Sequence, residues 1–507
     1  MDFGEISAFI LYFVVVLAIG VAFFLKDRHD TSEAGYFLGG RKMGAWVTAL
    51  SAQASDMSGW LLMGFPGSIF AFGMGKVWIG IGLGMGTILN WIIVAKRLRR
   101  FSKASGDSIT LPQYLTNRFA SKSPTLKIIC AVIFLVSFTV YVASAFVAGR
   151  TVLCSLVPWF ADGHETLALL FFSLIILAYT FLGGFKAVCW TDFFQGILML
   201  AALLAVPIVM MSSGRFDASY AGTFRDGITA FGANPFESSW QDIVTGLGWG
   251  LGYFGMPHIV VRFMSIEKPS MIKKSATVAI VWVVLSLGAA MAIAILGRTY
   301  VLSSGTALAE ALLPDGRNSI FIAVVQDIFP GFIAGLMLAA IIAASMSTAD
   351  SQLLVASSSF TSDLYKPLIR KNKASDREIT VVGRVVVIVV SAAAFFIANS
   401  GGEWASDIMA MVENAWGLFG SAFGPVIILS LFWKRLNYQG AVAGIVAGAV
   451  VDGLWLVFLT ASTGIYEIVP GFVAGMIAAA VVSKATPAPG EEVERIFERA
   501  TDTNIDD

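Results

Sequence analysis

Apolar runs of about 20 residues recur along the whole chain, separated by short polar and charged stretches. Runs of this length cross a hydrocarbon core of about 30 Å when they are helical. The pattern predicts thirteen membrane-spanning helices, at residues 7–26, 44–72, 77–95, 126–155, 165–183, 188–212, 240–261, 275–298, 318–358, 381–398, 404–433, 438–460 and 466–483. The ninth range is too long for one span, and we expect a helix followed by a tail that runs toward the cytoplasm.

Composition supports this interpretation, because 57% of the residues are hydrophobic and 13% are charged. A soluble domain has about 45–50% apolar and about 25% charged residues. The chain is therefore predicted to be an all-α polytopic membrane protein that carries no sizeable soluble domain. A net charge of zero gives no sign of nucleic-acid binding, and the three cysteines and three histidines are too scattered for a zinc or iron site. The oligomeric state stays open.

Basic residues are distributed unevenly between alternate loops, which predicts the orientation in the membrane. One set of loops contains 28 of the 34 basic residues, among them "KRLRR" at 96–100, Arg262 and Lys274, and the other set contains 6. We therefore expect the N-terminus outside and the C-terminus in the cytoplasm, in a cell (inner) membrane. The polar end of the chain, 485–507, is expected to be disordered or to form a short surface helix.

Two of the predicted spans contain an interruption. The second carries "SAQASDMSGW" at 51–60, and the seventh carries "GLGWGLGYFGMPH" at 246–258. Interrupted spans at corresponding places in two halves of a chain indicate the binding site of a transporter. Spans 2–6 and 7–11 form two blocks of five, whose odd number of helices makes their topologies inverted. Close helix packing is the alternative explanation for the glycines.

These blocks define the expected organisation of the chain. It comprises a first peripheral helix and cytoplasmic loop (1–43), a first repeat (44–213), a second repeat (240–435), two peripheral C-terminal helices (436–484) and a cytoplasmic tail (485–507).

A second polar patch lies in the ninth span, in "AAIIAASMSTADSQLLVASSS" at 339–359. Ala344, Ser347 and Thr348 share one helix face through their i, i+3 and i+4 spacing. The unwound second span would expose the carbonyls of Ala54 and Met57, so that about five neutral oxygens face one another. Such a set suits a monovalent cation, whereas a divalent ion prefers more carboxylates. Hydrogen bonds between packed helices are the alternative.

Five motifs in order resemble the sodium/proline symporters of the solute:sodium symporter family over about residues 5–485. They are "SAQASDMSGWLLMG", "YVASAFVAGR", "FLGGFKAVCWTDFFQG", "GLGYFGMPHIVVRF" and "MSTADSQLLVASS". The resemblance implies a five-plus-five inverted-repeat core of the LeuT type. It also implies three groups of site residues: a sodium site of Ala54, Met57, Ala344, Ser347 and Thr348; sodium coupling through Asp56 with support from Asp192; and a substrate site of Ser58, Gly59, Trp60, Tyr141, Trp249, Tyr253 and Pro257.

The expected function is sodium-driven uptake of L-proline by alternating access, with sodium as the coupling ion, and the chain is not expected to be an enzyme. Proline is a compact zwitterion, which suits a neutral pocket lined by aromatic rings. A sodium symporter for another small organic solute is the nearest alternative, and a solute sensor without transport is a more distant one. A second cation near Ser345 and Asp350, and a direct role of the intramembrane Glu413, are left open.

Overall fold

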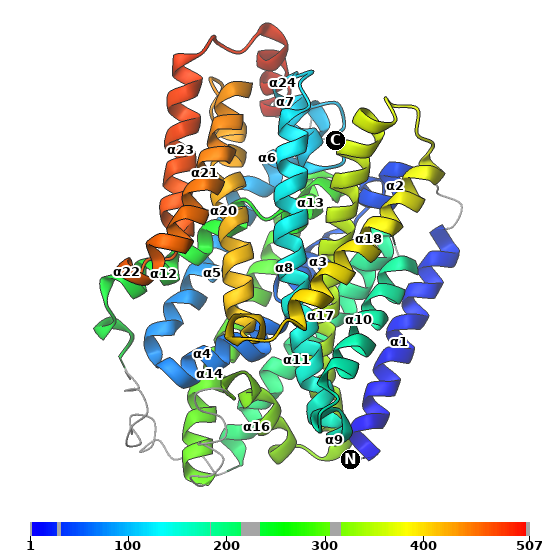
Figure 1. The fold of residues 1–507 in the computed structure, drawn as a ribbon, viewed down its shortest axis with the longest axis vertical. Helices are drawn as coiled ribbons and strands as arrows, with labels where there is room; N and C mark the ends of the chain where they lie inside the picture. The colour runs from blue at the N-terminus through cyan, green and yellow to red at the C-terminus, as the bar shows by residue number, and fades with distance from the viewer. Residues whose placement is uncertain (1–2, 28–31, 183, 214–233, 305–315, 503–507) are drawn as a thin grey trace.

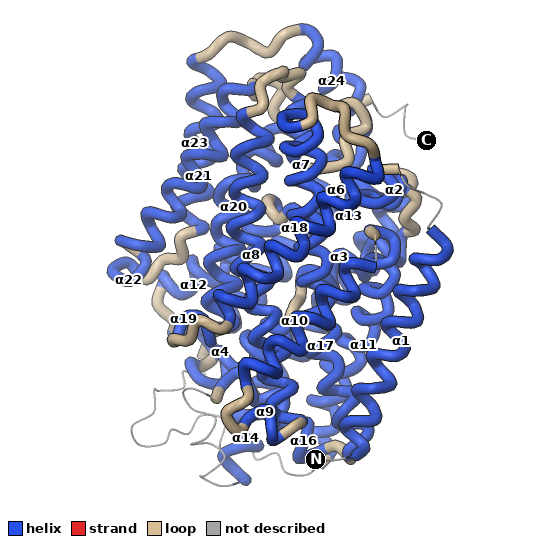
Figure 2. The backbone as a smooth tube through the Cα atoms, turned by 45° about the vertical axis from the view of Figure 1, so that its right-hand side comes forward, coloured by secondary structure: helices blue, strands red, loops and turns tan. Residues whose placement is uncertain are grey.

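The computed structural model describes residues 3–27, 32–182, 184–213, 234–304 and 316–502. These residues form helices and connecting loops, with no β-strand among them (Figures 1 and 2). The helices of the first half are α1 Phe3–Asp27, α2 Glu33–Leu38, α3 Ala45–Asp56, α4 Phe65–Phe72, α5 Val77–Leu89, α6 Ala95–Ala104, α7 Leu111–Arg118, α8 Thr125–Leu156, α9 Pro158–Ala161, α10 Glu165–Leu182 and α11 Phe185–Ser212. Those of the second half are α12 Trp240–Gly248, α13 Pro257–Ser265, α14 Ile272–Ser304, α16 Ile320–Ile328, α17 Gly331–Ser358, α18 Asp376–Ala398, α19 Glu403–Ser406, α20 Ile408–Phe432, α21 Tyr438–Phe458, α22 Thr460–Thr463, α23 Ile468–Ala485 and α24 Glu491–Thr501.

Within the described part of the chain, ten helical segments are long and apolar enough to cross a membrane, so the prediction of a multi-pass helical protein is confirmed. Three predicted spans fall outside this set. The span at 165–183 is the shorter apolar helix α10, and those at 44–72 and 240–261 are each divided between two helices. The total of thirteen spans therefore stays a prediction.

The ninth predicted range also contains two helices. α16 ends at Ile328, and α17 begins after Pro330, whose ring removes a backbone donor and starts a new helix. Beyond Ser358 the helix continues with wider turns to Ile369. The expected tail is therefore a helical extension of α17.

Helix α17 runs through the centre of the molecule, and α1 and α21 lie on opposite flanks (Figure 1). In α17, 83% of the most apolar stretch is buried inside the protein, against 28% in α1 and 28% in α21. The polar residues of α17 therefore face other helices, while the flanking helices present leucine and valine outward. Because its polar residues are buried, α17 can form hydrogen bonds with an interrupted helix in the core.

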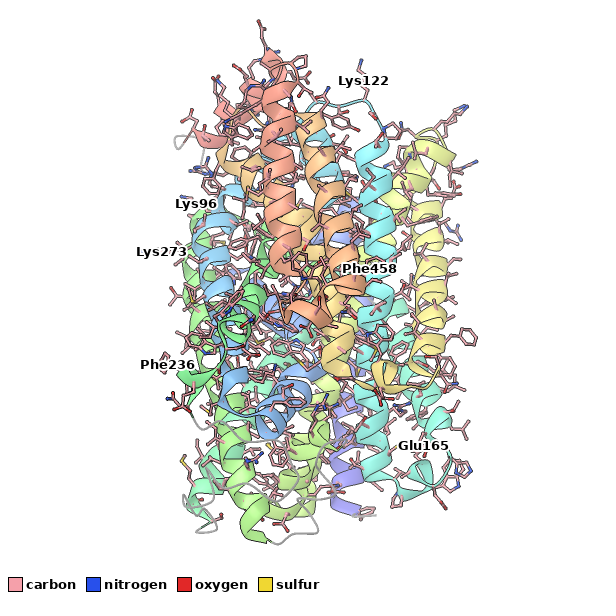
Figure 3. All side chains as sticks on the ribbon, turned by 60° about the vertical axis from the view of Figure 1, so that its left-hand side comes forward. Lys96, Lys122, Glu165, Phe236, Lys273 and Phe458 are labelled. Atoms are coloured by element: carbon pink, nitrogen blue, oxygen red, sulfur yellow. The ribbon has the colours of Figure 1, made fainter. Side chains whose placement is uncertain are left out.

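The beginning of α1 and the helix α24 lie at opposite ends of the molecule (Figure 1). Lys122 lies at the α24 end and Glu165 toward the other end (Figure 3). Helix α24 occupies much of the segment expected to be disordered or to form a surface helix, and its Glu498 accepts a hydrogen bond of 2.9 Å from Lys434. Residues 503–507 lie outside the described part of the chain.

Candidate ion and substrate site

The first interruption lies between α3 and α4, where the sequence predicts it. Helix α3 ends at Asp56 because Met57 adopts φ −90° and ψ 81°, which is not helical. The Ser58 amide, which would bond to Ala54 in a continuous helix, bonds to the Asp56 carbonyl at 3.1 Å. The Leu61 amide likewise bonds to Ser58 at 3.0 Å, and not to Met57. The carbonyls of Ala54 and Met57 therefore lose their helical partners, as predicted.

Helix α17 supplies a hydroxyl at this interruption. The Ser347 Oγ lies 2.8 Å from the Ala54 carbonyl oxygen and 3.1 Å from the Ala344 carbonyl oxygen. All three residues are buried, and so is the Thr348 hydroxyl, which has no hydrogen-bond partner among the described groups. Within those groups no hydrogen bond joins Ser347 or Thr348 to the Met57 carbonyl. The structure thus brings three of the five predicted oxygens into direct contact.

Asp56 joins the two interrupted helices. Its Oδ2 accepts a hydrogen bond of 2.5 Å from the hydroxyl of Tyr253, and its Oδ1 is buried without a partner in the described part of the protein. Its carbonyl oxygen accepts from the Tyr141 hydroxyl at 3.4 Å and from the Trp60 indole at 3.3 Å. A residue predicted to serve sodium coupling is therefore in contact with three residues predicted to surround the substrate.

The second interruption lies between α12 and α13. After Gly248 the chain forms tighter 3₁₀ turns over Trp249–Phe254, and Met256 is extended with ψ 110°. Pro257 then starts α13, where its missing amide is not needed. The predicted local unwinding is confirmed by this geometry.

Close packing explains two of the glycines near this interruption. A Cβ at Gly252 would lie 1.9 Å from the Trp416 Nε1 of α20, and one at Gly255 would lie 2.3 Å from the Phe419 carbonyl oxygen. The same indole donates a hydrogen bond of 2.8 Å to the Trp249 carbonyl. Helix α20 therefore closes tightly over the backbone of the interruption, so packing and unwinding occur together.

The predicted substrate residues are all buried, namely Ser58, Gly59, Trp60, Tyr141, Trp249, Tyr253 and Pro257. Tyr141, Trp60 and Tyr253 converge on Asp56, as described above. The ring of Trp249 packs against Tyr466, with centroids 5.3 Å apart. The structure therefore brings three members of the predicted set together around Asp56, while the ring of a fourth, Trp249, contacts Tyr466, two residues before α23.

Asp192, on α11, belongs to a separate buried polar cluster. Its Oδ2 accepts hydrogen bonds from Ser51 at 2.7 Å and from Arg262 Nη2 at 2.9 Å. The Arg262 guanidinium also donates to Ser51 and, at 2.6 Å, to the hydroxyl of Ser351. The Ser351 hydroxyl lies 3.3 Å from Asp350. One guanidinium thus joins α3, α11, α13 and α17 in a region where an unpaired charge is costly.

This cluster corrects one prediction. The pattern of basic residues predicts that Arg262 lies in a cytoplasmic loop, but it lies within α13 and its side chain is 1% exposed. Its position in the apolar run "HIVVRFM" was the available signal, because a charge there needs a buried partner. Two further residues at the site were not predicted. Trp416 binds the Trp249 carbonyl, and Asn90 donates a hydrogen bond of 2.9 Å to the Tyr253 carbonyl.

Comparison with known proteins agrees with this arrangement. The sodium:solute symporter family matches residues 36–448. Sodium/proline symporters of Staphylococcus aureus, for example those of strains JH9 and NCTC 8325, are 41% identical over 504 residues. The matched region covers 97% of this chain and 94% of each relative.

Solved structures show the same fold at lower identity. A sodium-coupled sialic acid symporter in a substrate-bound outward-open state aligns with a TM-score of 0.75 and 22% identity, covering 96% of this chain and 99% of that chain. A nucleobase-cation-symport-1 family transporter in a closed conformation aligns with a TM-score of 0.54 and 13% identity, covering 92% of this chain and 98% of that chain.

Proposed function

Because the chain belongs to the sodium:solute symporter family, we propose that it couples inward sodium movement to the uptake of L-proline. The observation that carries the proposal is the contact between Ser347 of α17 and the freed Ala54 carbonyl. A hydroxyl and two carbonyls already converge there without any formal charge. The name of the relatives at 41% identity supplies the solute.

The proposed sodium site consists of neutral oxygens from two helices. They are the carbonyls of Ala54, Met57 and Ala344 and the hydroxyls of Ser347 and Thr348. A small monovalent cation accepts such ligands, whereas calcium usually requires carboxylates. Sodium bound here would link the end of α3 to α17 and would hold the interruption in one shape. Asp56, two residues after Ala54, supports the ion by its charge.

The proposed substrate site adjoins the ion through Asp56. The zwitterion needs acceptors for its ammonium, donors for its carboxylate and flat walls for its ring. Interrupted backbone supplies acceptors, Ser58 and the tyrosine hydroxyls supply donors, and Trp60 and Tyr141 supply aromatic faces. Gly59, Trp249, Tyr253 and Pro257 complete the proposed set. The bond between Tyr253 and Asp56 provides a route by which the ion orders the substrate site.

The proposed architecture has thirteen spans, a five-plus-five inverted repeat of the LeuT type, and the termini on opposite sides. Three observations support it. Each block opens with an interrupted helix, the beginning of α1 and the helix α24 lie at opposite ends of the molecule (Figure 1), and the solved structures with this fold are transporters. From the distribution of basic residues among the loops, α24 is proposed to lie on the cytoplasmic side. Asp192 is proposed to support sodium coupling.

The free energy released by the entry of one sodium ion is sufficient to concentrate a scarce solute inside the cell. A membrane potential of about 100 mV contributes about 2.3 kcal/mol per charge. A tenfold sodium gradient contributes about 1.4 kcal/mol, so that one ion per solute supports roughly 500-fold accumulation.

Uptake of labelled proline into proteoliposomes tests the proposal. An inward sodium gradient should drive accumulation above equilibrium, and an equal gradient of an impermeant organic cation should not. Equal uptake under both gradients would contradict sodium coupling. Competition by a panel of unlabelled solutes distinguishes proline from another small solute, because the true substrate inhibits at the lowest concentration. Binding of the solute without any accumulation would favour the alternative in which the protein is a solute sensor that does not transport.

A further inference from the structure

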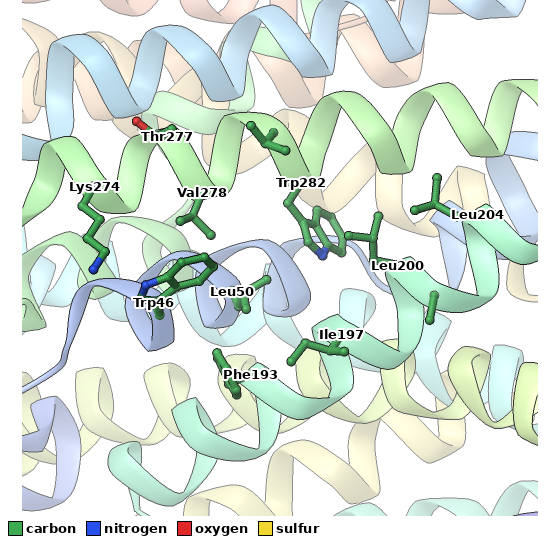
Figure 4. Close-up of a pocket in the computed structure, with 12 residues that line it drawn as sticks. Trp46, Leu50, Phe193, Ile197, Leu200, Leu204, Lys274, Thr277, Val278 and Trp282 are labelled. Atoms are coloured by element: carbon green, nitrogen blue, oxygen red, sulfur yellow. The ribbon is translucent and has the colours of Figure 1, made fainter.

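A groove of about 730 Å³ opens on the outer surface between α3, α11 and α14 (Figure 4). Its size is typical of a site for an organic molecule, about 300–1,000 Å³. Leu50, Phe193, Leu200 and Trp282 form apolar walls and floor, and Lys274 is the one charged residue among those that line it. Ile197 is 47% exposed although it lies in a membrane-spanning helix, so this groove faces the hydrocarbon of the bilayer.

The two ends of the groove differ in chemistry. Lys274 lies in the first turn of α14 and Trp46 in the first turn of α3, and both are at the same end (Figure 4). The Lys274 ammonium lies 5.8 Å from the centroid of the Trp46 ring, and it forms no ion pair with a carboxylate in the described part of the chain. Leu200 and Leu204 lie at the opposite end, where all lining groups are apolar. The groove therefore has a cation at one end and only apolar side chains at the other.

The length of the groove matches one leaflet. From Phe193 to Leu204, helix α11 rises about 16 Å at about 1.5 Å per residue. One leaflet accounts for half of a hydrocarbon core of about 30 Å. A molecule with its charge at Lys274 and its tail at Leu204 thus has the dimensions of a membrane lipid in place.

The floor of the groove lies directly behind the proposed ion site. The Trp282 indole donates a hydrogen bond of 3.0 Å to the Gly196 carbonyl of α11. A Cβ at Gly196 would lie 3.3 Å from the Cβ of Ala54 and 3.5 Å from the Leu50 carbonyl oxygen. Trp282, which lines the groove, is therefore connected through Gly196 to Ala54, whose carbonyl belongs to the proposed ion site.

We propose that this groove binds one anionic phospholipid of the surrounding bilayer, with its phosphate at Lys274 and an acyl chain along α11. The ammonium, next to the amino-terminal turns of two helices, attracts the phosphate. The acyl chain fills the apolar walls and holds α3 against α11 and α14. This lipid site is independent of the identity of the transported solute.

Native mass spectrometry of the purified full-length protein tests the charge at the head of the groove. Phosphatidylglycerol is compared with phosphatidylcholine that carries the same acyl chains. We expect one tight phosphatidylglycerol molecule, whose affinity falls about fivefold in Lys274→Gln, as for the loss of one lysine near a membrane surface. The neighbouring Lys273, which is exposed and does not line the groove, is the matched control. Equal affinity for both lipids, or equal losses in Lys274→Gln and Lys273→Gln, would overturn the proposal.

A second variant tests the apolar part. Ala201 lines the groove and is exposed, so Ala201→Trp fills the groove without entering the core and should abolish the tight lipid. Ala392→Trp, on the exposed surface of α18, should leave lipid binding unchanged. Glycerol phosphate added at the concentration of the lipid should not displace it, because the acyl chain supplies part of the affinity. Retained lipid in Ala201→Trp, or displacement by glycerol phosphate, would contradict binding in the groove.

Discussion

The two interrupted helices differ in the interactions that stabilise their non-helical segments. At the first, side chains donate hydrogen bonds to backbone carbonyls, as Ser347 and Tyr141 do at the carbonyls of Ala54 and Asp56. At the second, the backbone is packed directly under α20, with Gly252 against Trp416 and Gly255 against Phe419. The first interruption is therefore a polar site whose contacts a ligand can replace, whereas the second is a steric one that fixes the position of Tyr253.

The largest expected effect is steric and falls on the second interruption. Gly252→Ala would place a methyl group 1.9 Å from the Trp416 Nε1, so we expect the free energy of unfolding to drop by about 3 kcal/mol. Thermal or denaturant unfolding in detergent measures the change.

Gly288→Ala is the matched control, because a Cβ there meets no atom within 4 Å. It should leave stability unchanged or slightly raised, since alanine favours a helix. Equal stability of the two variants would show that packing under α20 does not hold the second interruption.

The next largest effect concerns charge at the first interruption. Asp56→Asn keeps the size of the side chain and removes its charge, so we expect the sodium concentration for half-maximal uptake to rise at least tenfold. Sodium activation curves of proline uptake provide the measurement. Asp162→Asn, in an exposed loop, is the control. An unchanged curve for Asp56→Asn would remove this residue from sodium coupling.

A smaller effect is expected at Tyr253, whose hydrogen bond to Asp56 joins the two interruptions. Two substitutions there separate its role in substrate binding from its role in sodium binding. Tyr253→Ala removes a wall of the proposed substrate site, and we expect the proline KM to rise about tenfold with a smaller change in sodium requirement. Tyr253→Phe deletes only the hydroxyl that donates to Asp56, and a rise of about fivefold in KM is expected. Both are measured by initial uptake rates. A larger change in sodium requirement than in KM for Tyr253→Ala would place Tyr253 with the ion.

Local rules predicted both interruptions from the sequence. Polar residues within 51–60, and five glycines followed by Pro257 within 246–258, conflict with a continuous apolar helix. The shared face of Ala344 and Ser347 likewise follows from helical periodicity. These features depend on residues close together in the chain, so the structure agrees with them.

Contacts between distant segments were harder to predict. The bond from Tyr253 to Asp56 spans 197 residues, and the salt bridge from Arg262 to Asp192 spans 70. No local pattern around any of these residues identifies its partner. Counting basic residues predicts a loop position for Arg262, because the count does not reveal how deeply a residue lies in the membrane. The position of Trp416 over Gly252 depends on how α20 packs, which no local pattern determines.

Calorimetric titration of proline tests the central claim most directly, namely that Ser347 and the freed Ala54 carbonyl bind the coupling ion. Proline should bind the purified protein at least tenfold more tightly in sodium than in an impermeant organic cation, and Ser347→Ala should lose most of this difference. Equal proline affinity in the two cations, or full sodium dependence in Ser347→Ala, would contradict the account.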